Sequence, residues 1–140
     1  MKKLHSVTLL AVALVLSFYS CEKTEDTVSQ TRTIEKGGCI SITGNAFPSI
    51  CFDSLITDSR CPADAVCVWA GFAAVRLSIK NDAGIIQQFT LATQGFSNLP
   101  IPANDTTING YHIKVVDVTP YPILSAPSQE PKKVKLEITY

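Results

Sequence analysis

The chain has 140 residues, of which 46% are hydrophobic, and its 12 lysines and arginines balance its 12 aspartates and glutamates. This length allows one domain of ordinary size. The composition lacks the basic excess that binding to a phosphate backbone requires, so no nucleic acid partner is expected.

Residues 1–20 have the pattern of a signal peptide. Lys2 and Lys3 form a positive start, and the run from Val7 to Phe18 is apolar except for two polar residues. This run is shorter than a comfortable transmembrane helix and has the length of the hydrophobic part of a signal peptide. Residues 1–20 are therefore not expected to belong to the folded domain.

A cysteine, Cys21, follows directly after the apolar run and Ser20. This arrangement resembles the lipobox of bacterial lipoproteins, although Phe18 and Tyr19 replace the usual leucine and small residue, as lipoproteins of the Bacteroidetes often tolerate. The resemblance implies a lipidated Cys21 at the new N-terminus and an outer-membrane anchor, on the surface or the periplasmic face. The alternative is an ordinary signal peptide with cleavage nearby and an unmodified thiol.

Few apolar residues occur between residues 22 and 37, so we expect a flexible linker from 21 to 37 and a folded domain from 38 to 140. Lys23 among acidic neighbours resembles the surface-export signal of such lipoproteins, and a solvated charged linker is the alternative. Loss of the signal peptide removes Lys2 and Lys3, which leaves a net charge near −2.

The four remaining cysteines are Cys39, Cys51, Cys61 and Cys67. An even number in a small exported domain predicts two disulfides, for which three connectivities exist. Strand alternation favours a pair between Cys39 and Cys51 on the outer side of a hairpin, which leaves Cys61 with Cys67. The gaps of eleven, nine and five residues do not fit the close spacing of zinc ligands, so neither a metal nor another cofactor is expected.

Several segments have the period of β-strands. The pattern of residues 67–79 predicts one long strand with Trp69 in the core. A turn is expected at 81–84, followed by a second strand over 85–91. Residues 95–110 predict a loop. Alternation from Tyr111 to Val115 and from Val134 to Tyr140 predicts two further strands. Short strands joined by proline, glycine and asparagine turns indicate an all-β fold, a small antiparallel sandwich or barrel.

The segments DSRCP (58–62) and CVWAG (67–71), with a later PYP (120–122), resemble a group of uncharacterised small bacterial lipoproteins of the Bacteroidetes type. The resemblance covers about residues 38–140. It implies an exported β domain with a bridge between Cys61 and Cys67, and it implies no activity.

Residues that could catalyse a reaction are scattered. His112 is expected on an outer strand face, and Asp58 with Arg60 predicts a local salt bridge that orients the disulfide-closed segment. Tyr121, between two prolines, is a candidate for an exposed aromatic contact or for a loop anchor.

The sequence therefore predicts a non-enzymatic binding or scaffolding lipoprotein of the cell envelope. Its partners would be the membrane, through the lipid, and a protein or a glycan at the cell surface. The candidate binding loop contains Arg60, Pro62, Asp64 and Tyr121. The alternative is a secreted inhibitor-like module that presents the loop from Cys61 to Cys67 to a protease or a host protein, because a stapled loop loses little entropy on binding.

Overall fold

The computed structural model of the chain describes residues 27–44, 48–94, 100–126 and 128–140. The expected signal peptide and Cys21 lie outside the described residues, as do residues 22–26 of the expected linker. In the described ranges no helix is long and apolar enough to cross a membrane.

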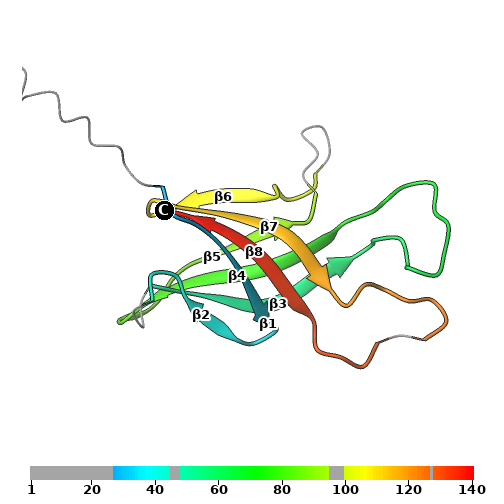
Figure 1. Ribbon diagram of the computed structural model, residues 1–140, viewed down its shortest axis with the longest axis horizontal. Helices are drawn as coiled ribbons and strands as arrows, with labels where there is room; N and C mark the ends of the chain where they lie inside the picture. The colour runs from blue at the N-terminus through cyan, green and yellow to red at the C-terminus, as the bar shows by residue number, and fades with distance from the viewer. Residues whose placement is uncertain (1–26, 45–47, 95–99, 127) are drawn as a thin grey trace, which may run out of the picture.

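Two antiparallel four-stranded sheets pack against each other, which confirms the expected all-β sandwich (Figure 1). The first sheet has the order β1-β8-β7-β6 and the second the order β2-β3-β4-β5. The strands are β1 (Ser29–Glu35), β2 (Cys39–Ser41), β3 (Ser49–Asp58), β4 (Ala73–Asn81), β5 (Gly84–Ala92), β6 (Asp105–Ile108), β7 (Tyr111–Thr119) and β8 (Lys133–Thr139).

The core lies between the sheets and follows the alternation of the strands. In β8, Val134, Leu136 and Ile138 are fully buried, whereas Lys133 and Lys135 are exposed. The opposite sheet contributes buried side chains from β3 and β4, among them Phe52 and Leu77. Burial of these large apolar side chains is the main stabilising contribution to a small sandwich.

Both favoured disulfides are present. Cys39 and Cys51 are direct partners in the register of β2 and β3 and are bonded to each other. Cys61 and Cys67 are bonded across a separation of six residues.

The expected flexible linker was wrong over Ser29–Glu35, because these residues form β1 and pair along β8. Strand β1 lies at the edge of its sheet and buries only Ile34 in the core. An edge strand that covers so little of the core can be mostly polar, so its composition resembles that of a linker.

The expected loop over 95–110 was also wrong at its end, where Asp105–Ile108 form β6. Asn109 and Gly110 both have positive φ and connect β6 to β7 by a two-residue hairpin turn. Asn-Gly is the preferred pair for such a turn, so this signal was present in the sequence.

The expected long strand from Cys67 to Ile79 begins only at Ala73. Residues 59–72 form a loop between β3 and β4, which we call the disulfide loop. Residues 120–132 connect β7 to β8, and we call them the proline loop.

The disulfide loop and the proline loop leave the same end of the sandwich (Figure 1). The opposite end is where Ser29 pairs with Thr139 and the backbone N–H of Val28 donates to Tyr140. We call the end with the two loops the loop end.

Candidate functional site

In the disulfide loop, the backbone hydrogen bonds between β3 and β4 continue beyond the ends of the two strands. The backbone N–H of Ser59 donates to the carbonyl of Phe72 at 2.8 Å, and that of Cys61 donates to Ala70 at 3.0 Å. The disulfide between Cys61 and Cys67 then closes the tip of the loop. The backbone of this loop is therefore held by hydrogen bonds and by a covalent bond.

Gly71 allows the two sides of the loop to approach closely. It has a φ of +65°, and a Cβ at this position would lie 1.9 Å from the carbonyl oxygen of Ser59. Both the backbone conformation and the contact require glycine.

A buried guanidinium, that of Arg60, connects this loop to both sheets. Its Nε and Nη2 donate to the two carboxylate oxygens of Asp58 at 2.8 and 2.9 Å. Its Nη1 donates to Asp117 at 3.2 Å and to the carbonyl of Val118. The side chain is only 4% exposed, and the Tyr121 ring covers it with a centroid 4.0 Å from the guanidinium carbon.

These contacts stabilise the charged forms of Asp58 and Arg60. Burial by itself would raise the pKa of Asp58, but the hydrogen bonds and charges of Arg60 and Lys132 outweigh burial and lower that pKa. Burial would lower the pKa of Arg60, and its contacts with Asp58 and Tyr121 raise it instead. Lys132 donates to Asp58 at 3.2 Å and also to the carbonyl of Pro120 at 2.6 Å, so the proline loop joins the same cluster.

Asp64 joins the disulfide loop to the proline loop. Its carboxylate accepts from the backbone N–H of Leu124 at 2.7 Å, from that of Ser125 at 2.9 Å and from the Ser125 hydroxyl at 2.7 Å. These hydrogen bonds lower the pKa of Asp64 to about 2. The backbone N–H of Ala63 also donates to Pro122 at 2.9 Å. The two loops therefore form one braced unit.

This brace holds large apolar side chains in solvent. Val66, Val68, Trp69 and Leu124 are 103%, 95%, 75% and 74% exposed. The other large exposed hydrophobic side chains of the described chain reach at most 46%. We call these four residues the apolar tip.

The expectation that Trp69 packs in the core was therefore wrong. The alternation of apolar residues continues from β4 back to Cys67, but residues 67–72 extend beyond the end of the sandwich. No opposite sheet covers a side chain at that position, so alternation there does not produce burial.

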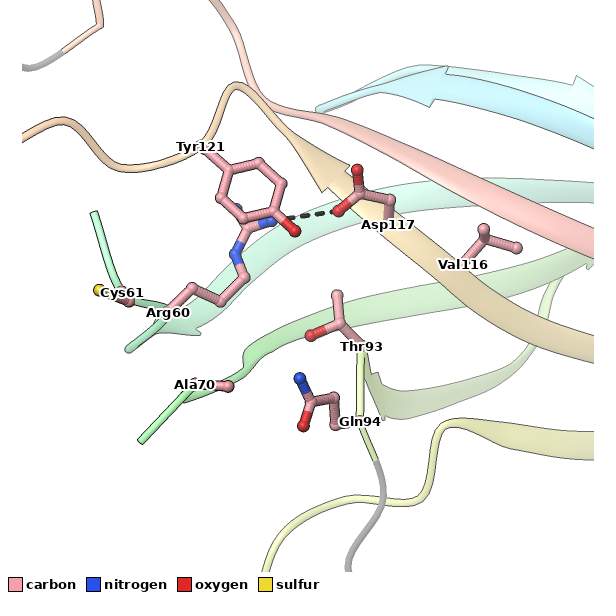
Figure 2. Close-up of a pocket in the computed structure, with 8 residues that line it drawn as sticks. All are labelled: Arg60, Cys61, Ala70, Thr93, Gln94, Val116, Asp117 and Tyr121. Carbon is pink, nitrogen blue, oxygen red and sulfur yellow. Dashed lines mark hydrogen bonds and ion pairs between the residues drawn. The ribbon is translucent and has the colours of Figure 1, made fainter. Parts of the chain in front are cut away.

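A pocket of about 330 Å³ lies at the base of the two loops. Figure 2 shows Tyr121 in front of Arg60 on one side of the pocket, with Thr93 and Gln94 on the other. Ala70 and Cys61 line it from the disulfide loop, and Val116 and Asp117 line it from β7.

The four residues of the expected binding loop all lie at this end. Arg60 is internal, Asp64 is occupied by the proline loop, and Pro62 is half-buried with its carbonyl accepting from Ala65. Tyr121 is both an anchor over Arg60 and 44% exposed. Sequence reasoning missed the exposed residues Val66, Val68 and Leu124, whose types alone indicate a core.

His112 lies at the other end of β7, where it pairs with Thr139. Its side chain is 44% exposed and lies 3.2 Å from the Thr107 hydroxyl and 3.5 Å from the Asp105 carboxylate. The expected outward orientation is confirmed. Among the described residues no group of three or more His, Cys, Asp or Glu could hold a metal ion.

Comparison of the chain with protein-family models, with curated proteins and with solved structures found no match.

We expect Arg60→Met to lower the free energy of unfolding by about 3 kcal/mol, because it removes the buried guanidinium that joins Asp58 to Asp117 and leaves Asp58 only Lys132 as a cationic partner. Urea denaturation measures the change. Arg76→Met is the matched control, since Arg76 is exposed on β4, and it should change stability by no more than about 0.5 kcal/mol. Equal stability of the two variants would contradict a structural role for Arg60.

Acid should release the proline loop from the disulfide loop. The folded pKa of Asp64, about 2, lies below the ordinary 3.8, so the hydrogen bonds stabilise the brace fully above pH 3.8 and are lost as the pH falls through about 2. Amide hydrogen exchange at Leu124 and Ser125 should therefore lose protection between these pH values. Asp64→Asn should abolish this pH dependence, and an unchanged profile in that variant would contradict the assignment.

Proposed function

We propose that the protein is a lipid-anchored protein of the bacterial outer membrane that binds or scaffolds other molecules at the cell envelope and catalyses no reaction. The observation that carries the proposal is the apolar tip, held in solvent by a rigid brace at one end of the sandwich. Apolar side chains exposed to this degree indicate an interaction surface. A preorganised loop also binds with less loss of conformational entropy.

The proposed anchor rests on the sequence before the domain. An apolar run extends from Val7 to Phe18, Cys21 follows after two further residues, and β1 begins at Ser29. Ser29 lies at the end of β1 that is opposite to the loop end. An anchor at Cys21 would thus leave the loop end free to contact a protein or a glycan.

Lipidation is tested by metabolic labelling with a palmitate analogue in a bacterium that processes lipoproteins. We expect the wild-type protein to carry label and to sediment with membranes, and Cys21→Ser to lose both properties. The control is Cys61→Ser with Cys67→Ser, which should keep the label because it leaves Cys21 intact. Wild-type protein without label would contradict the anchor.

Added protease on intact cells then distinguishes the two faces of the outer membrane. Loss of a tag on the domain would indicate the cell surface, and protection until the outer membrane is broken would indicate the periplasm.

A second candidate function is an inhibitor-like module that presents the loop from Cys61 to Cys67. It is favoured by the disulfide that closes this loop and by the fully exposed Val66 beside Cys67. Incubation with serine and cysteine proteases should then give tight inhibition that is lost in Val66→Glu and kept in Val28→Glu. Rapid cleavage within 61–67 without inhibition would contradict this function.

A further inference from the structure

At the loop end, a protruding cluster of apolar side chains (the knob) lies next to a pocket (the hollow). The knob is the apolar tip, whose largest side chain is Trp69. The hollow is the pocket of about 330 Å³, and Ala70, the neighbour of Trp69, is part of its lining. Cys61 and Ala70 of the pocket lining belong to the same disulfide loop as Trp69, so the apolar tip and this wall of the pocket are parts of one loop.

The pocket has a mixed lining on which the faces and the N–H group of an indole ring both find partners. Val116, Ala70 and Cys61 give it apolar walls, and Arg60, Asp117 and Thr93 contribute polar ones. The side chains of Gln94 and Tyr121 also line it and can accept a hydrogen bond. A buried tryptophan needs an apolar site with an acceptor for its N–H group.

We propose that two copies of this chain associate through their loop ends, with Trp69 of each copy in the pocket of the other. A two-fold dimer uses the same patch on both copies, so the patch must be complementary to itself. An adjacent knob and pocket on one chain satisfy this condition. The proposal rests on the proposed function, because it assigns a partner to the same loop end. It does not depend on the lipid anchor.

The size of the loop end fits a specific interface. The disulfide loop and the proline loop contain 14 and 13 residues. A standard protein–protein interface uses about 20–30 residues on each side. The combined length of the two loops is therefore comparable with one side of such an interface, although Arg60 is internal and would not contribute to it.

The charges within the disulfide loop and the proline loop favour a protein over a bilayer. The basic side chains of the two loops, Arg60 and Lys132, are both paired with Asp58. The carboxylate of Asp64 lies beside Leu124 of the apolar tip. Surfaces that dock on anionic membranes instead surround their apolar residues with free lysine and arginine.

The test in solution uses the chain from Glu22 to Tyr140, which contains every strand of the described residues, both disulfides and the only tryptophan of the sequence. Analytical ultracentrifugation and tryptophan emission are recorded over concentrations on the order of 1 µM to 1 mM. We expect the mass to double and the emission of Trp69 to shift to shorter wavelength over the same concentration range. A monomer at every concentration would overturn the proposal, as would a short-wavelength emission that is independent of concentration.

A substitution in the pocket tests the geometry without altering the tip. Val116→Arg fills the pocket from an exposed position on β7, and we expect it to weaken association at least tenfold while Trp69 keeps its solvent-exposed emission. Ile56→Arg is the control, because Ile56 is 46% exposed and Val116 is 43% exposed, and Ile56 does not line the pocket. Equal association of the two variants would overturn the proposal.

The whole chain is tested in cells. A photoreactive residue at Val68 should crosslink two differently tagged copies, and the same residue at Ile56 should not. Crosslinks from Val68 to other proteins or to lipid alone would overturn the proposal. Because these results concern only the loop end, they are independent of the labelling of Cys21.

Discussion

The buried guanidinium of Arg60 is the interaction on which the loop end depends. Its two carboxylate partners lie in different sheets, Asp58 at the end of β3 and Asp117 near the end of β7. The planar guanidinium sets the direction of each hydrogen bond, so one side chain determines how the ends of both sheets are placed. An arginine buried to this degree is tolerated only because its hydrogen bonds and the Tyr121 ring replace water.

The apolar tip follows from this constraint. Apolar side chains in solvent are unfavourable by roughly 25 cal/mol for each Å² left exposed, and a flexible loop would fold them against the domain. Here the disulfide, the backbone hydrogen bonds that continue beyond β3 and β4 and the hydrogen bonds of Asp64 hold the loops in an extended conformation instead. The exposure of Trp69 thus follows from the hydrogen bonds and the disulfide that hold the two loops, and we propose that a binding partner covers this surface.

In the site, the contacts between residues close together in the sequence could be predicted, and those between distant residues could not. The salt bridge between Asp58 and Arg60 spans two residues and was expected, and it is present. The contact between Arg60 and Asp117 spans 57 residues and joins the two sheets, so no spacing in the chain could indicate it. Trp69 has the period of a core residue, yet the period of a strand does not say where the opposite sheet ends.

The sequence by itself determined the all-β class and strands β4, β5, β7 and β8 in large part, and it favoured the observed pairing of the four cysteines, because alternation and turn residues act over a few neighbours. The tertiary structure decided the rest. Edge strands β1 and β6 form because β8 and β7 offer backbone partners, which their own polar composition does not reveal. The exposure of the apolar tip was decided in the same way, since burial depends on what lies opposite a side chain and not on its type alone.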